Sequence, residues 1–155
     1  MNGATTGSAV AANATNPNTG LAPTYRIPFE NEWYKAAYYK GGSTSAGYWN
    51  YATQSNSAPG TTIGSSPNQA NYNNAIGHAT DVGSLSGSGS FYGTFDQTGN
   101  VWQWNDLTGT TGSSRGFRGG NWYSGYSSYV SSSDRNNNDP SYEGGSIGFR
   151  LASPA

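Results

Sequence analysis

One stretch of the chain has the hydrophobic spacing of an α-helix, and the predicted helix covers Glu30–Tyr39. Trp33, Ala36 and Ala37 recur there at helical intervals, which places them on one face. We therefore expect Trp33 and both alanines to pack inward. Gly41-Gly42 follows directly, and glycine is typical of the residues that end a helix.

The other predicted elements are short strands separated by long irregular segments. Alternation is clearest in Gly99–Trp104, where Trp102 and Trp104 fall on the same side of a strand. Arg115–Trp122 and Ile147–Ala152 are further strand candidates. Tryptophans in such segments are more often core residues than binding platforms, so we expect them to pack inside.

Composition predicts one domain with an aromatic core. Of the 155 residues only 33% are hydrophobic, but 5 Trp and 12 Tyr compensate because each ring buries a large area. We expect Tyr48–Tyr51 to form a buried aromatic patch. Only 10% of residues are charged and the net charge is -1, which argues against nucleic acid as a partner. No apolar run has the length needed for membrane insertion.

Two segments near the C-terminus, Tyr123–Tyr129 and Asn136–Ser146, have neither a helical nor a strand period, which predicts surface loops. Tyr, Ser, Gly and Asn are typical of adaptable binding loops, although ordinary polar loops have similar compositions. The candidate ligand-binding residues are Tyr123, Ser124, Tyr126, Ser127, Tyr129, Asn136, Asn137, Asn138, Asp139, Tyr142 and Glu143.

Residue types that are rare or missing exclude several kinds of chemistry. The chain has no cysteine, which excludes disulfides, thiolate metal sites and thiol nucleophiles. His78 is the single histidine, so a multi-histidine metal centre is excluded as well. A hydrolytic triad of His78, Asp81 and a serine lacks a nucleophile elbow, and the acidic residues form no glycosidase motif. We predict no catalytic residues.

Four motifs resemble, in order, the signatures of a known family. They are Tyr25-Arg26-Ile27-Pro28-x-Glu30-x-Glu32-Trp33, Gly99-Asn100-Val101-Trp102-Gln103-Trp104, Arg118-Gly119-Gly120-Asn121-Trp122 and Gly148-Phe149-Arg150. Through them the chain is similar to the formylglycine-generating enzyme (sulfatase-modifying factor) domain. The resemblance implies an α+β fold of the C-type lectin-like type, with short twisted sheets, much irregular structure and few helices.

The resemblance does not extend to the family's enzymatic activity. The family's oxidase needs a pair of copper-binding cysteines after the Arg-Gly-Gly-x-Trp signature, and the matching stretch, Tyr123–Tyr129, has none. Related iron enzymes need several histidines. The chain therefore resembles the non-catalytic members, in particular the variable proteins of diversity-generating retroelements, whose framework encloses codons mutated at adenines. Asn, Tyr, Ser, Gly and Asp are among the products of such changes.

The family also binds calcium near its Gly-Asn-x-Trp-Glu-Trp signature. The resemblance implies that the matching ligands here are Asp96, the carbonyls of Gly99 and Val101, and Gln103. Gln103 replaces a glutamate and so removes a charge, which weakens a calcium site. Alternatively, Asp96 and Gln103 only hydrogen-bond the turn into the strand.

Residues 1–23 are polar, and we expect a leader that is flexible or docked on a partner, with the domain spanning residues 24–155. The family normally has a further strand and helix in front of the Tyr-Arg-x-Pro signature, and this leader does not supply them. A missing strand exposes a sheet edge, which favours assembly with another copy through that side. The leader also lacks the basic and apolar regions of a signal peptide.

Taken together, the sequence predicts a non-enzymatic, receptor-like or adhesin-like module, a bacterial pseudoenzyme that is extracellular or on a cell surface. Its ligand is a protein or glycan on another surface. The alternative is a self-assembling structural subunit of an extracellular fibre or coat. Arg135 and Arg150 could anchor a ligand, but arginines in framework motifs more often brace loops by pairing with carbonyl or carboxylate groups.

Overall fold

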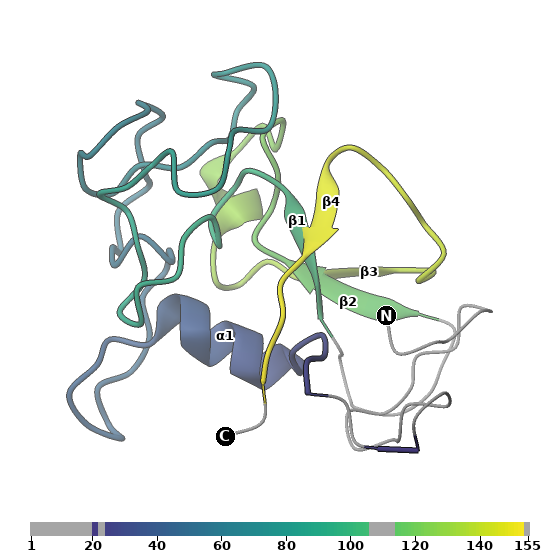
Figure 1. Cartoon of the computed structure of the whole chain (residues 1–155). Coiled ribbons are helices and arrows are strands. Elements are labelled where there is room, and N and C mark those ends of the chain that lie inside the picture. The colour runs from purple at the N-terminus through teal and green to yellow at the C-terminus, as the bar shows by residue number, and fades with distance from the viewer. Residues whose placement is uncertain (1–19, 22–23, 106–113, 154–155) are drawn as a thin grey trace.

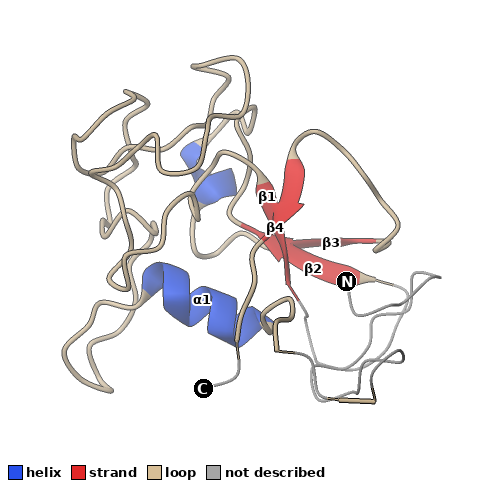
Figure 2. Cartoon of the chain, in the orientation of Figure 1, coloured by secondary structure: helices blue, strands red, loops and turns tan. Residues whose placement is uncertain are grey.

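The computed structural model describes residues 20–21, 24–105 and 114–153 (Figure 1). Within these residues one α-helix lies beside a small sheet, and loops make up most of the remaining chain (Figure 2). The elements are α1 (Glu30–Tyr38), β1 (Trp102–Asn105), β2 (Arg115–Arg118), the 3-10 helix η1 (Ser127–Val130), β3 (Asn136–Asn138) and β4 (Ile147–Phe149). The sparse secondary structure predicted from the sequence is confirmed. No helix in this described part is long and apolar enough to cross a membrane.

The sheet has the strand order β3-β2-β1-β4. β1 pairs antiparallel with β2, so that Trp104 lies opposite Phe117, and it pairs parallel with β4 on its other side. β3 pairs antiparallel with β2, which places Asn137 opposite Gly116. The expectation that Asn136–Ser146 is entirely loop was therefore wrong at its start, because backbone pairing with β2 makes Asn136–Asn138 a strand.

The predicted alternation in β1 is confirmed, but the fully buried side is polar. Gln103 and Asn105 are buried, whereas Trp102 and Trp104 are only half-buried. Both tryptophans pack edge-to-face on Phe117, with ring centroids 5.0 Å and 5.3 Å from it. The expectation that they are core residues is correct only in part, because the inward side of β1 is taken by Gln103 and Asn105.

The helix α1 supplies the centre of the core. Its N-terminus is closed by Glu32, whose carboxylate accepts a hydrogen bond from the Phe29 N–H at 2.9 Å. Trp33, Ala37 and Tyr38 are completely buried and cluster with Ala52. Ala36 is only half-buried, so Tyr38 takes the inward position expected for that alanine.

The helix ends one residue earlier than predicted. Tyr39 adopts an extended conformation and pairs with Tyr48, which begins the segment expected to be a buried aromatic patch. In that segment Tyr51 is buried, Trp49 is half-buried and Tyr48 is exposed. The prediction of a fully buried patch was wrong, because only part of the segment turns towards the core.

Side-chain amides hold the long loops together. Asn100 has a positive φ of 67°, and its side-chain oxygen accepts a hydrogen bond from the Thr80 N–H at 2.8 Å. Its backbone N–H donates to the Asn71 carbonyl at 2.8 Å, and its carbonyl accepts from the Trp122 N–H at 2.9 Å. Three distant segments therefore meet at this one asparagine, which explains how a chain with little regular structure is held together.

Candidate ligand-binding surface

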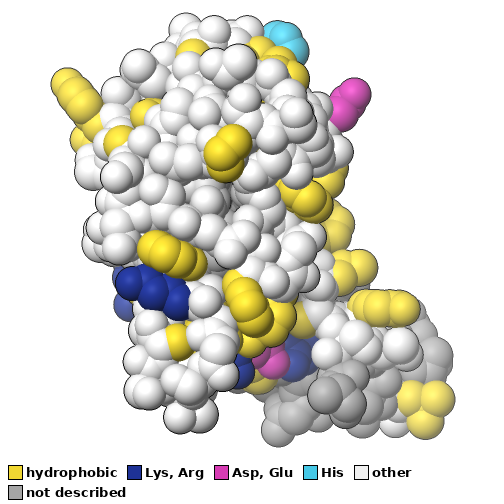
Figure 3. Space-filling model, turned by 90° about the vertical axis from the view of Figure 1, so that its left-hand side faces the viewer, with side chains coloured by type: hydrophobic (Ala, Val, Ile, Leu, Met, Phe, Trp, Pro, Cys, Tyr) yellow, Lys and Arg dark blue, Asp and Glu magenta, His cyan; other side chains and the backbone are white. Residues whose placement is uncertain are grey.

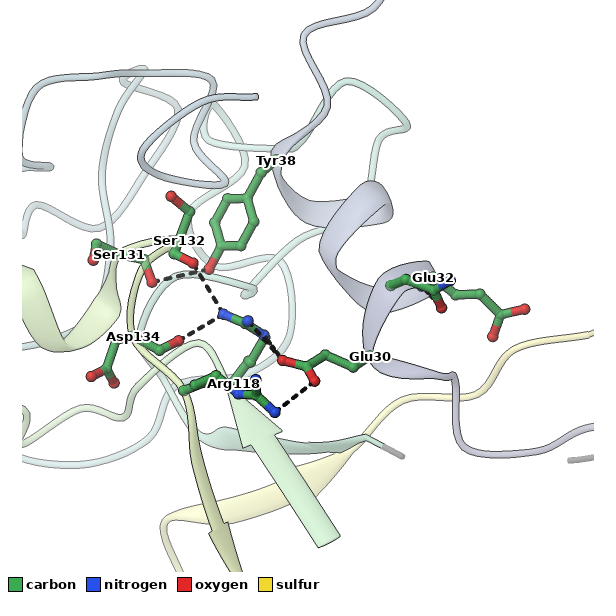
Figure 4. Close-up of polar contacts among 9 residues, drawn as sticks. Glu30, Glu32, Tyr38, Arg118, Ser131, Ser132 and Asp134 are labelled. Atoms are coloured by element: carbon green, nitrogen blue, oxygen red, sulfur yellow. Dashed lines mark hydrogen bonds and ion pairs between the residues drawn. The ribbon is translucent and has the colours of Figure 1, made fainter. Parts of the chain in front are cut away.

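The segment between the two candidate loops is braced by Arg118, which projects from β2. Its Nη1 donates to the carbonyls of Ser132 and Asp134 at 3.0 Å and 2.8 Å (Figure 4). Its Nε donates to Glu30 Oε1 at 2.9 Å, which joins the segment to the first turn of α1. Because the Arg118 side chain is only 9% exposed, this ion pair is protected from water.

Glu30 also forms an ion pair with a second arginine, Arg135. Arg135 Nη2 lies 2.9 Å from Glu30 Oε2, immediately before β3 begins. The interpretation of Arg135 as a bracing residue is therefore confirmed, and so is that of Arg150, which donates to the Phe95 carbonyl at 2.7 Å. The sequence analysis did not identify the role of Glu30 as the shared anchor of two arginines. The available signal was its place within the first family motif.

The first candidate segment presents three tyrosines. Tyr123, Tyr126 and Tyr129 are 53%, 70% and 48% exposed, and the rings of Tyr126 and Tyr129 meet edge-to-face at 5.8 Å. Ser127 begins η1 and is half-buried. Ser124 does not lie on the surface as expected. It is buried because its hydroxyl accepts from the Asn121 N–H at 3.1 Å and donates to Asn121 Oδ1 at 2.9 Å.

The second candidate segment is exposed along most of its length. All three residues of β3 are exposed, and so are Asp139, Tyr142 and Glu143. A turn forms after β3, where Asp139 Oδ1 accepts hydrogen bonds from the Ser141 N–H and hydroxyl at 2.8 Å and 2.7 Å. These two hydrogen bonds hold the pKa of Asp139 below its ordinary value. The Asp139 carboxylate is therefore ionised at neutral pH and faces solvent.

The two segments flank the sheet rather than forming one loop. In Figure 1, η1 lies to the left of β1 and the β3–β4 connection lies to the right of β4. The hydroxyl oxygens of Tyr123 and Ser146 lie 3.2 Å apart, which links the first segment to the C-terminal end of the second. We call the exposed candidates the loop surface: Tyr123, Tyr126, Tyr129, Asn136, Asn137, Asn138, Asp139, Tyr142 and Glu143.

Asp96 and Gln103, which match the family's calcium site, lie together, and hydrogen bonds within the protein occupy every polar side-chain atom of the pair except Asp96 Oδ1. Gln103 Oε1 accepts hydrogen bonds from Trp33 Nε1 at 2.9 Å and from Arg150 Nε at 2.7 Å. Gln103 Nε2 donates to the Asp96 carbonyl at 2.6 Å. Asp96 Oδ2 accepts from the Gly83 N–H at 2.8 Å, and Asp96 Oδ1 is buried without a partner. These contacts match the alternative interpretation, in which Asp96 and Gln103 support the turn.

This arrangement does not fit a calcium ion. Calcium takes about six to eight oxygen ligands and favours carboxylates, whereas Asp96 supplies the one carboxylate and Gly99 and Val101 offer backbone carbonyls only. The guanidinium of Arg150 lies against Gln103 and would repel a second cation. Burial raises the pKa of Asp96 and lowers that of Arg150 to about 10, so Arg150 keeps its charge at neutral pH.

The single helix, the small mixed sheet and the long cross-linked loops define a C-type lectin-like domain of the formylglycine-generating-enzyme type. The model of the sulfatase-modifying factor enzyme 1-like domain matches residues 3–155, and the chain belongs to this family. No protein of curated function shows significant sequence similarity to it.

Solved structures that share the fold include the following two. The first is Treponema denticola variable protein 1, with a TM-score of 0.59 and 26% sequence identity over 92% of this chain. The second is CarF, with a TM-score of 0.56 and 26% identity over 84% of this chain. The chain spans about half of each, covering 54% of the variable protein and 47% of CarF. The predicted resemblance to a variable protein is thus matched by a similar structure.

Proposed function

We propose that this chain is a non-enzymatic module that binds a protein or glycan on another surface, and that it acts outside the cell or on the cell envelope. The observation that carries the proposal is the loop surface itself. Tyr123, Tyr126 and Tyr129 are each about half exposed or more, yet they lie between Arg118 and the segment that Arg118 braces at Ser132 and Asp134. A rigid base that holds amphipathic rings in water is the arrangement found in binding loops.

The polar part of the loop surface suits a ligand of variable shape. Asn136, Asn137 and Asn138 are exposed on an edge strand, and their side chains can donate and accept hydrogen bonds. Tyr142 follows at 50% exposure. Tyrosine supplies contact area at a low entropic cost, and the asparagines adapt to the partner's polar groups. The similarity to a variable protein supports this assignment.

A non-enzymatic role is also supported by the residues that the family's chemistry would need. The stretch that matches the position of the copper-binding cysteines contains tyrosine, serine and glycine instead. Serine and tyrosine oxygens are poor ligands for copper(I), which prefers thiolates. His78, the single histidine, is exposed, and its Nδ1 lies 2.8 Å from the Ala79 carbonyl oxygen. We therefore assign no catalytic residue.

A binding screen tests the proposal. The wild-type chain and the variant with Tyr123→Ala, Tyr126→Ala and Tyr129→Ala would be applied to a glycan array and to an array of extracellular proteins. We expect reproducible hits for the wild type and their loss in the triple variant. Val82→Ala is the matched control, because Val82 is 86% exposed and lies outside the loop surface. Hits that the triple variant retains would place binding elsewhere.

A second experiment tests whether the loop surface is diversified. Deep sequencing of the codons for residues 118–146 in the source population should find changes within residues 121–146, at adenines of asparagine-type codons. Codons for the framework residues Arg118, Gly119 and Trp122 should remain constant. An invariant stretch would contradict diversification and leave a module with one fixed ligand.

An alternative function is a self-assembling structural subunit of an extracellular fibre or coat. The observation in its favour is that β3 and β4 are the two edges of the described sheet, and edge strands recruit other chains. Part of the predicted assembly side, residues 1–19 and 22–23, lies outside the described residues. Sedimentation velocity over a range of concentrations distinguishes the two functions. A binding module should sediment as one small species at every concentration, whereas a fibre subunit should form larger assemblies as the concentration rises.

A further inference from the structure

A second group of exposed rings lies at the C-terminal end of α1. Tyr39 stacks on Tyr92 at 5.9 Å and meets Phe91 edge-to-face at 5.6 Å and Tyr48 at 6.2 Å. Tyr48, Phe91 and Tyr92 are 47%, 48% and 49% exposed, so about half of each ring faces water. Together with Lys35 and Lys40 we call this group the aromatic-lysine face. Apolar rings gathered in this way on a surface mark an interaction site.

The rings are held in place by the backbone around them. Gly41 has a φ of 78°, and a Cβ at this position would overlap the Phe91 ring. Phe91 and Tyr92 sit at the tip of a tight turn closed by the Ser90 N–H, which donates to the Thr94 carbonyl at 2.8 Å. The rings are therefore fixed before any partner arrives, which lowers the entropic cost of binding.

The charge of this face is not neutralised within the described part of the chain. Lys35 and Lys40 are the two lysines of the sequence, and neither forms an ion pair with a described residue. Lys35 Nζ lies 5.8 Å from the centroid of the Tyr39 ring and Lys40 Nζ lies 4.7 Å from that of Trp49. By contrast, the ion pairs with Glu30 and Glu32 are all made by arginines. The face is thus cationic in a chain whose net charge is -1.

The aromatic-lysine face lies on the opposite side of the molecule from the β3–β4 part of the loop surface (Figure 1). In Figure 1 the C-terminal end of α1 lies on the left of the molecule and the β3–β4 connection lies on the right. Figure 3 views the left-hand side, where Lys or Arg side chains adjoin hydrophobic ones. A partner seated here would not cover the β3–β4 connection, so that part of the loop surface stays free (Figure 1).

We propose that the aromatic-lysine face docks an acidic segment of a protein partner, one that brings carboxylates to Lys35 and Lys40 and apolar side chains to the exposed rings. Charge complementarity selects the carboxylates. Most ring pairs here meet edge-to-face, with interplanar angles of 62°, 87° and 80°, so the surface is corrugated rather than one flat platform. Such a surface suits protruding side chains better than the flat face of a sugar. This site is independent of the proposed function.

Selection from a random peptide display library tests the proposal. The immobilised chain would carry Tyr123→Ala, Tyr126→Ala and Tyr129→Ala, which removes contributions from the loop surface. We expect enrichment of peptides that combine Asp or Glu with aromatic or large aliphatic residues. The affinity of a synthetic copy of the most enriched peptide should fall about tenfold with Lys35→Glu and Lys40→Glu combined. The double variant Lys35→Arg and Lys40→Arg is the matched control and should retain binding.

Other outcomes would overturn the proposal. Enriched peptides without acidic residues, no enrichment, or binding that survives the two glutamate substitutions would each contradict an acidic partner at this face. Polygalacturonate, added as a second probe, should not compete with the peptide for the aromatic-lysine face. Competition that depends on Lys35 and Lys40 would show instead that the partner is a carboxylated polysaccharide. Concentration-dependent dimers abolished by the glutamate variant would make the occupant a second copy. Failure of the loop-surface screen leaves this proposal unaffected, because the selection is made without the loop tyrosines.

Discussion

The loop surface and the aromatic-lysine face both expose tyrosines, but the structure supports them in different ways. Under the loop surface the support is ionic, because Glu30 holds both Arg118 and Arg135. Under the aromatic-lysine face it is packing of rings against rings, which continues through Tyr34 to the buried Tyr38. A chain with few aliphatic residues can therefore fix a surface either by ion pairs or by aromatic contacts.

The two supports also imply different tolerance to sequence change. At the loop surface Glu30 and Arg118 brace the backbone between the two segments, and Asp139 holds only its own turn, so most of the exposed side chains are free to vary. At the aromatic-lysine face the exposed rings are themselves the packing contacts, so changing one disturbs its neighbours. We therefore expect the loop surface to suit changing ligands and the aromatic-lysine face to suit a constant partner.

The largest expected effect comes from Glu30→Gln. The substitution leaves the buried charge of Arg118 without its carboxylate, and removing one partner of a buried pair costs about 3 kcal/mol of unfolding free energy. Urea denaturation would measure it. The matched control is Glu32→Gln, because Glu32 is 40% exposed and its pair with Arg26 should contribute less than about 1 kcal/mol. Equal losses of unfolding free energy in both variants would show that the Arg118–Glu30 ion pair stabilises the fold no more than the more exposed Arg26–Glu32 pair does.

Gly41→Ala should have the next largest effect, about 2 kcal/mol, because it combines a strained positive φ with an overlap on Phe91. The substitution should also lower the affinity of acidic peptides for the aromatic-lysine face and leave ligand binding by the loop surface unchanged. Gly42→Ala is the control, since φ is 88° there but no atom lies within 4 Å of the added Cβ. Chemical denaturation of both variants gives their losses of unfolding free energy, and the difference between them separates the cost of the overlap with Phe91 from the cost of the positive φ. Similar losses would mean that Phe91 is not held by this contact.

Smaller effects should distinguish the exposed rings of the two surfaces. Tyr126→Ala should change the unfolding free energy by no more than about 0.5 kcal/mol, because Tyr126 is 70% exposed. Phe91→Ala should cost about 1 kcal/mol, since its ring contacts Tyr39 and Tyr92. Thermal unfolding monitored by circular dichroism would show which of the two variants is less stable. The reverse order would contradict the difference in support described above.

The smallest effect is expected from calcium. Because Arg150 and Gln103 pair where the family's ion would bind, millimolar calcium should move the melting temperature by less than about 1 °C relative to a chelator. Magnesium at the same concentration controls for ionic strength. A clear rise specific to calcium would show that Asp96 and Gln103 can leave their present partners and form a metal site.

Much of the fold was predictable because its signals are local. Helical spacing around Trp33, alternation around Trp102 and four ordered motifs identified the helix, β1 and the family. For the candidate site, the exposure of Tyr123 and Tyr126 followed from a segment with no hydrophobic period. These features depend on neighbouring residues, so the sequence carries them directly.

The errors arose where a residue's environment depends on distant partners. Ser124 belongs by composition to a binding loop, but its hydroxyl pairs with Asn121 and is buried. Asn136–Asn138 has no strand period and becomes a strand because its backbone pairs antiparallel with β2. Phe91 and Tyr39 lie far apart in the chain, so no local pattern indicated that their rings would meet.

By itself, the sequence determined the family, the absence of cysteine ligands, the position of the helix and the tyrosine-rich composition of the loops. Only the tertiary structure decided which of these side chains reach solvent, that Glu30 anchors Arg118 across 88 positions, and that Gln103 faces Arg150. The physical reason is that composition and spacing are local properties. Burial, charge pairing and ring contacts are instead made between segments that folding brings together.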